Sequence, residues 1–113
     1  MQTLDSDEVS IHIDASPEDV AWVVERWDSV VSRVVARGGS PEELQARDER
    51  DGMLGTRRRL AGVWETFLGT EPIRIEVRTD GSVHVLDGRH RIEAARRLGV
   101  AKLPAQIVRS GAR

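Results

Sequence analysis

Apolar residues recur along this chain with two periods, one typical of helices and one typical of strands. The longest helical stripe begins at Ser16, which is suited to be an N-cap, and Pro17, which is suited to the first helical position. Valines and tryptophans then recur every three or four residues as far as Arg37, where a glycine pair ends the pattern. We expect Trp27 to lie in the middle of the buried stripe and Trp22 near its edge.

A second helix is predicted from Ser40 to the residues before Gly52. Ser40 and Glu43 stand at capping-box spacing, but Leu44 is almost the only apolar residue that follows. We therefore expect a polar surface helix that frays. Its carboxylates are interpreted as a solvated charged face, with metal binding or a general base as the alternative; they are Glu42, Glu43, Asp48, Glu49 and Asp51.

A third helix is predicted to begin at Thr56, to bury an apolar stripe that includes Trp64 and Phe67, and to stop at Gly69. Three arginines, residues 57–59, would lie in its first turn, where cations oppose the helix dipole. Either an anionic ligand or salt bridges to the preceding acidic helix would offset them.

The strand pattern appears in four short segments. Residues 9–13 alternate apolar and polar side chains, with His12 on the polar face, where a solvated imidazole is expected. Residues 73–77 and 83–86 alternate in the same way around Asp80-Gly81, a hairpin turn signal. A helix over residues 89–98 and a strand over residues 103–108 follow. We expect Ile92, Ala95 and Leu98 on one helix face, small alanines where the helix meets the sheet, and a right-handed parallel crossover between its two flanking strands.

The fold class is therefore α+β. The sequence predicts a small mixed β-sheet with a strand-turn-helix motif, preceded by a helical N-terminal region. We expect a single domain over residues 1–113, with the N-terminal strand and helices in residues 1–69 and a β-β-α-β core in residues 70–113.

Composition changes this picture in two ways. The chain has no cysteine, so disulfides, thiol nucleophiles and thiolate metal sites are excluded. The net charge of −2 divides unevenly: residues 1–69 hold 8 Lys/Arg and 14 Asp/Glu (net −6), and residues 70–113 hold 9 and 5 (net +4). A basic C-terminal part would suit an anionic ligand, and a solvated mixed-charge surface is the alternative. No apolar run approaches the roughly 20 residues of a membrane span, and the start is unlike a signal peptide, so we expect a cytoplasmic protein.

The strongest chemical signal lies where the second hairpin strand meets the following helix. Gly88 breaks the extended pattern, and Arg89, His90 and Arg91 then occupy the first helical turn. Backbone N–H groups at a helix start lack intrahelical partners, and the dipole is positive there. A glycine turn, a helix start and arginines together suit a phosphate group. Asp87 would cap the helix, orient His90 or help to hold Mg²⁺, and N-capping is the most economical of these roles.

These residues also carry a family resemblance. The run from Gly88 to Ala94 fits the pattern G-x-H-R-x-x-A and resembles the nucleotide-binding motif of the ParB/sulfiredoxin-like superfamily. The resemblance covers about the last forty residues, from Glu71 to about Arg109, and the order of the flanking elements agrees with it. It implies that Gly88, Arg89, His90 and Arg91 bind the phosphates of a nucleoside triphosphate such as ATP or CTP.

The departures from that family narrow the function. Sulfiredoxins place a catalytic cysteine where this chain has Arg89, so reduction of sulfinic acids is excluded. Chromosome-partitioning members continue into further domains for which this chain has no room. The remaining classes are nucleotide hydrolysis, kinase-like phosphoryl transfer, nucleases and polymorphic-toxin domains, with His90 and Asp87 as the catalytic candidates and Mg²⁺ bound at Asp87. Kinase-like members take a carboxylate base from outside the motif, and Glu65, Glu71 and Glu76 are available.

The alternative from another class is a non-catalytic module that binds DNA or a protein partner and keeps the phosphate pocket as an anion site. The partners left open are a nucleotide, DNA, a second copy of the chain, or an immunity-type protein in the case of a toxin exported by a specialised route. A dimer through the first helix would use an exposed second stripe near Trp22.

Overall fold

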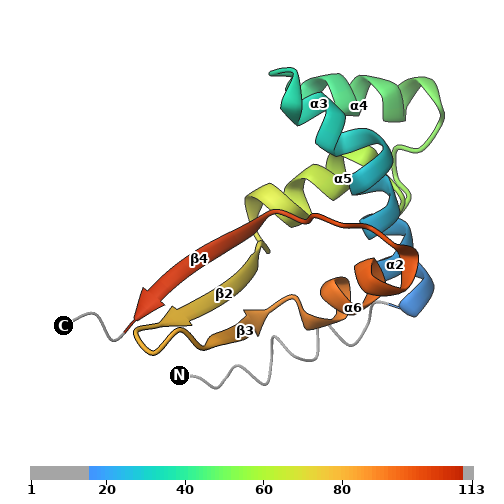
Figure 1. Cartoon of the computed structure of the whole chain (residues 1–113). Helices are drawn as coiled ribbons and strands as arrows, with labels where there is room; N and C mark the ends of the chain where they lie inside the picture. The colour runs from blue at the N-terminus through green and yellow to red at the C-terminus, as the bar shows by residue number, and fades with distance from the viewer. Residues whose placement is uncertain (1–15, 111–113) are drawn as a thin grey trace.

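The computed structural model describes residues 16–110, and the strand and histidine predicted within residues 9–13 lie outside the described part. The described chain is α+β, as predicted: helices come first, and a small three-stranded mixed sheet lies near the C-terminus (Figure 1). None of the helices between residues 16 and 110 has the length and apolar character needed to cross a bilayer.

The first predicted helix forms as one continuous helix that contains a π-helical turn. It comprises α2 (Pro17–Arg26), the π-helical turn η1 (Trp27–Val31) and α3 (Ser32–Ala36). Ser16 caps it, because its hydroxyl accepts a hydrogen bond from the Asp19 N–H at 3.0 Å. Trp27 is buried and Trp22 half-buried, which confirms the predicted stripe. The spacing of apolar residues in the sequence does not predict this π-helical turn.

The second helix, α4 (Pro41–Arg50), forms at the surface as predicted, with two of its residues buried, and its fraying stays a prediction. The Ser40 side chain makes no capping hydrogen bond, and Glu43 forms a salt bridge with Arg37 instead of closing a capping box. Leu44 is fully buried, and the Asp48 side chain is only 1% exposed. Asp48 is therefore part of the interior, whereas Glu42, Glu49 and Asp51 are exposed, as expected for a solvated charged face.

Asp48 caps the next helix across the turn between them. Its two carboxylate oxygens accept hydrogen bonds from the N–H groups of Leu60 at 2.7 Å and Ala61 at 3.0 Å. The helix therefore begins at Leu60, with α5 (Leu60–Trp64) continuing into the π-helical turn η2 (Glu65–Gly69). The prediction that Thr56 is the cap is wrong: its hydroxyl donates to the Met53 carbonyl at 2.7 Å within a tight turn.

The sheet has the order β3-β2-β4. Its strands are β2 (Ile73–Arg78), β3 (Val83–Asp87) and β4 (Ala105–Ser110). The hairpin of β2 and β3 is antiparallel, as predicted, whereas β4 pairs in parallel with β2. The predicted parallel crossover from β3 to β4 is therefore wrong, because these two strands run in opposite directions on either side of β2.

The motif helix α6 (Arg89–Leu98) has the predicted bounds but a different neighbour. It packs chiefly against α2 rather than on the sheet, and Ala94 and Ala95 are buried at this close contact. Leu98, at the end of the helix, is 46% exposed. The neighbour of the motif helix is therefore a helix and not the predicted sheet.

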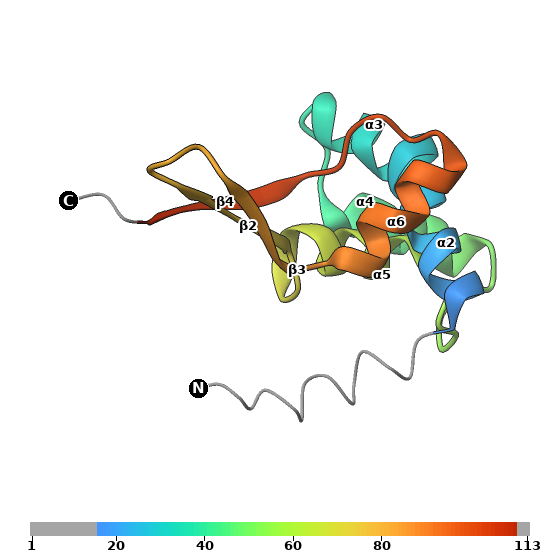
Figure 2. The same ribbon diagram turned by 60° about the horizontal axis from the view of Figure 1, so that its bottom comes forward.

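The sheet extends away from the helices in both views (Figure 1 and Figure 2), and the molecule measures 50 × 32 × 25 Å. Its inner end is anchored by Ile73, which is fully buried in the helical core. Trp27 and Phe67 meet in that core with ring centroids 5.0 Å apart. Farther out, Val83 is 60% exposed and Ile107 is 48% exposed.

Candidate functional site

The start of α6 depends on Gly88 for two separate reasons. Its φ of +100° lies in the left-handed region that L side chains rarely adopt. A Cβ atom at this position would also lie 2.6 Å from Cγ1 of Ile73. The close approach is therefore to Ile73, at the beginning of β2. The glycine therefore fixes how the strand β3 enters the helix.

The first turn of α6 presents its N–H groups beside exposed basic side chains. Gly88 is the N-cap, so the capping residue itself has no side chain to offer, and no acidic residue lies in the first turn. The N-cap position predicted for Asp87 is therefore taken by Gly88. The first helical bond runs from the Ile92 N–H to the Gly88 carbonyl at 3.1 Å, so the preceding N–H groups have no acceptor within the helix. Arg89 and His90 are both exposed next to them.

Arg91 points into the protein and not into solvent. Its side chain is 9% exposed, its guanidinium carbon lies 5.3 Å from the centroid of the Phe67 ring, and Nη1 donates to the Thr66 carbonyl at 3.5 Å. Loss of hydration lowers the pKa of Arg91, and attraction by Asp87 and then Glu71 partly offsets this. The residue predicted as the phosphate clamp thus joins α6 to η2, and it brings a buried positive charge to the helix start.

The carboxylates predicted to bind Mg²⁺ or to act as a base differ in their distance from Arg91 and in their partners. Asp87 is the last residue of β3, is half-buried, and is in register with Arg74 of β2. Of the three candidate bases, Glu71 acts electrostatically on Arg91, whereas Glu76 accepts a hydrogen bond from Arg78 at 3.1 Å. Within residues 16–110, no group of three or more His, Asp or Glu side chains is arranged to hold a metal ion. Asp87 is therefore a single candidate ligand.

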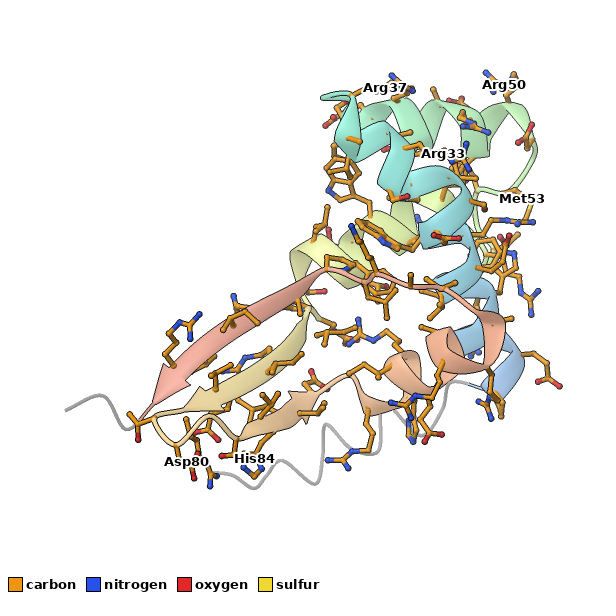
Figure 3. All side chains as sticks on the ribbon, viewed as in Figure 1. Arg33, Arg37, Arg50, Met53, Asp80 and His84 are labelled. Carbon is orange, nitrogen blue, oxygen red and sulfur yellow. The ribbon has the colours of Figure 1, made fainter. Side chains whose placement is uncertain are left out.

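The other described histidine lies far from the motif. His84 is on β3 near the turn that carries Asp80, at the outer end of the sheet (Figure 3). The structure therefore does not bring it to His90 at the start of α6.

The arginines of residues 57–59 lie before α5 and not in its first turn. Arg58 Nη2 contacts one oxygen of Asp19 at 3.1 Å, and Arg57 Nη1 contacts the other at 3.4 Å. The predicted salt bridges thus go to the first helix and not to the acidic helix α4. Hydrogen bonds with Arg58 and then Ser16 lower the pKa of Asp19.

A hollow of about 510 Å³ lies between α2, α4 and α5, on elements that the motif does not include. Sequence analysis missed it, because its walls come from segments far apart in the chain. Its lining includes tryptophans, arginines and glutamates, together with a helical glycine: Trp22, Trp64, Arg57, Arg59, Glu42, Glu65 and Gly62. The one signal available beforehand was Trp22, placed at the edge of its stripe.

Comparison with known proteins adds no relative. The chain matches no protein-family model, no curated protein and no solved structure.

Proposed function

We propose that this chain is a small ParB/sulfiredoxin-like domain that binds a phosphate group of a nucleotide or nucleic acid at the start of α6. The observation that carries the proposal is the combination at Gly88. A ten-residue helix begins there with a glycine as its N-cap and no acidic residue in its first turn, and Arg89 and His90 are exposed beside it. Such a helix start attracts anions through its N–H groups and its dipole.

The four motif residues divide the binding between them. Gly88 allows the turn that exposes the N–H groups, and Arg89 supplies a mobile guanidinium that can reach a phosphate oxygen. His90 adds a hydrogen-bond donor. Arg91 acts from behind: its buried charge raises the local positive potential, because the surrounding protein screens it less than water would. A nucleoside triphosphate such as ATP or CTP fits these donors.

If the site is catalytic, the chemistry it supports is phosphoryl transfer or phosphodiester hydrolysis. Arg89 and His90 would stabilise negative charge on the phosphate, and Asp87 would help to hold Mg²⁺ or orient His90. Mg²⁺ would supply charge neutralisation at the phosphate, and Asp87 would contribute one ligand, with phosphate oxygens and water completing the shell.

The second candidate is a non-catalytic module that binds DNA or a protein partner. The observation that favours it is the net charge of +4 in residues 70–113. Exposed arginines on several elements contribute to it, among them Arg74 on β2, Arg96 on α6 and Arg109 on β4. A binder needs only this basic surface, whereas a catalyst needs groups within hydrogen-bond reach of the reacting atoms.

The first experiment is calorimetric titration with ATP, CTP, GTP and a short DNA duplex, each with and without Mg²⁺. The variant is Arg89→Ala and the matched control is Arg96→Ala, which removes the same exposed side chain from the other end of the same helix. We expect Arg89→Ala to weaken binding by about 1.5 to 3 kcal/mol, the value of a charge-assisted hydrogen bond. Arg96→Ala should bind nearly as the parent does.

Equal losses in the two variants would show a diffuse charge effect, and equal retention would show that the phosphate site lies elsewhere. Salt-sensitive binding of the duplex alone would favour the DNA-binding module. Arg91→Ala is the weaker test, because it also removes a buried side chain from the contact with Phe67.

Catalysis is tested separately by product release from the ligand that binds. His90→Ala and Asp87→Asn should abolish turnover while leaving a folded protein, if these side chains act on the substrate. Binding without any product would support the non-catalytic module.

A further inference from the structure

The hollow between α2, α4 and α5 contains a glycine that the backbone does not require. Gly62 lies inside α5 with ordinary helical backbone, since its φ is not among the positive values in the described chain. A Cβ atom at this position would meet nothing closer than Nη2 of Arg59 at 3.9 Å. Glycine weakens a helix interior relative to alanine. Neither turn geometry nor close packing therefore explains why a glycine stands here. The absence of a side chain at Gly62 leaves open space beside Arg59.

Two indole rings border this space. Trp22 and Trp64 are both half-buried, and both line the hollow. Trp22 is held in place by the guanidinium groups of Arg26 and Arg58, whose central carbons lie 5.6 and 5.7 Å from the ring centroid. Among residues 16–110 the only aromatic ring pair in contact is Trp27 with Phe67. The indoles at the hollow are therefore not packed against each other.

Positive charge gathers at the same edge. Arg57 and Arg58 share a single carboxylate, that of Asp19, and Arg57 is 75% exposed. Arg59 uses its Nε to donate to the Thr56 carbonyl at 3.2 Å, and no salt bridge involves it in the described part of the chain. Its terminal nitrogens, next to Gly62, remain available for an anion.

A carboxylate completes the lining. Glu42, from the start of α4, borders the hollow, whereas the carboxylate of Glu65 lies against Gly69 at the end of η2. A carboxylate accepts hydrogen bonds from ring N–H and exocyclic amino groups, and it repels an anion that lacks such donors. A flat ring that carries N–H donors and an anionic group would therefore suit the tryptophans, the carboxylate and the arginines together. A volume of about 510 Å³ falls within the range of small-molecule pockets.

From this combination we infer that the hollow is a second binding site, separate from the start of α6, and that it takes one nucleotide unit. The base lies against Trp64, as bases do on aromatic platforms. Glu42 accepts hydrogen bonds from its amino or ring N–H groups. Arg57 and Arg59 hold the phosphate. The unit comes either from a free nucleoside monophosphate or from the end of a single-stranded nucleic acid, since both present the same chemistry.

The test uses the fluorescence of the full-length chain. Excitation at the red edge of tryptophan absorption, where bases do not absorb, monitors the three tryptophans of the chain during titration with AMP, GMP, CMP, UMP and a short single-stranded oligonucleotide. Of these, Trp22 and Trp64 line the hollow. We expect quenching by at least one of these probes. A response to the mononucleotides identifies a free nucleotide as the source, and a response to the oligonucleotide alone identifies a strand end.

The key variant is Gly62→Leu, which fills the hollow, and its matched control is Gly62→Ala, which adds only a Cβ atom. Both should melt at or above the temperature of the parent, because either residue favours a helix more than glycine does. Gly62→Leu should weaken binding by about tenfold or more, while Gly62→Ala keeps it. Arg59→Ala should weaken binding about tenfold, the loss of one charge-assisted contact.

Arg89→Ala separates this site from the one on α6. The inference predicts that Arg89→Ala quenches as the parent does. Silence from all probes would overturn it, and so would undiminished binding by a folded Gly62→Leu variant. If Arg89→Ala lost nucleotide binding while Gly62→Leu retained it, the inference would also be overturned. That result would place the nucleotide at the start of α6, in support of the proposed function.

Discussion

At the scale of single residues, Gly88 carries a backbone constraint and a packing constraint at once. The positive φ alone would disfavour a side chain, and the 2.6 Å distance from a built Cβ to Ile73 Cγ1 adds a collision with a buried neighbour. Gly99, at the other end of α6, shares the positive φ but has nothing within 4 Å of a built Cβ. A substitution at Gly99 therefore introduces conformational strain alone, whereas the same substitution at Gly88 introduces both strain and steric overlap.

We predict that Gly99→Ala lowers the free energy of unfolding by about 1 kcal/mol, the cost of a left-handed L residue. Gly88→Ala should lower it by about 1 to 3 kcal/mol more, because the core around Ile73 must also shift. Denaturant titration of both variants measures the difference. If the two variants are equally destabilised, the contact with Ile73 contributes nothing.

Asp48 is the residue whose burial most alters the interpretation of the sequence. Two backbone N–H groups at the start of α5 donate to it, and it belongs to a different helix. We predict that Asp48→Ala costs about 2 to 4 kcal/mol of unfolding free energy, since two buried donors lose their acceptor. Glu49→Ala, an exposed carboxylate on the same helix, should change stability by less than about 0.5 kcal/mol. Thermal or denaturant unfolding compares the pair, and similar effects would contradict the capping role.

At the scale of elements, Asp19 ties the first turn of α2 to the segment before α5. Hydrogen bonding with Arg58 and then Ser16 lowers its pKa below the ordinary value of 3.8. A carboxylate with a lowered folded-state pKa stabilises the fold above its unfolded-state pKa, and that contribution is lost as the pH falls toward the folded-state value. The ion pairs of Asp19 with Arg57 and Arg58 should therefore weaken only in acid, and added salt should screen them.

We predict that Asp19→Asn is less stable than the parent at neutral pH and that the difference shrinks as the pH falls below about 4. Unfolding curves at several pH values measure this, and added salt should reduce the neutral-pH difference. Glu18→Gln removes the adjacent exposed carboxylate and serves as the control. A difference between Asp19→Asn and the parent that is independent of pH would contradict the ion-pair explanation.

At the scale of the whole molecule, the helices and one end of the sheet form the core, and the rest of the sheet extends beyond it (Figure 1). Ile73 and Ile107 lie on neighbouring strands, yet the first is fully buried and the second is 48% exposed. Stability should therefore depend strongly on the inner end of the sheet and weakly on its outer part.

We predict that Ile73→Ala costs about 2 to 5 kcal/mol of unfolding free energy, as expected for a truncated core side chain. Ile107→Ala should cost less than about 1.5 kcal/mol, because much of its surface is already in water. Denaturant unfolding measures both, and amide hydrogen exchange should be faster near Asp80, at the outer turn, than in α2. Equal costs would mean that the outer part of the sheet is covered in solution.

The sequence by itself determined the features that depend on near neighbours. Ser16 and Asp19 lie three residues apart, the hairpin turn follows from Asp80-Gly81, and the bounds of α6 follow from glycines at both ends, so caps and periodicity predicted these elements. Even the positive φ of Gly88 was predictable, because only glycine adopts it without strain.

Only the tertiary structure decided which distant groups meet. Asp48 replaces Thr56 as the cap of α5, Arg91 packs on Phe67, α6 lies against α2, and β4 pairs with β2 instead of forming the expected crossover. The hollow beside Gly62 is of the same kind. Each depends on contacts between segments separated by many residues, and local propensity and periodicity carry no information about which of several compatible faces and donors will pair.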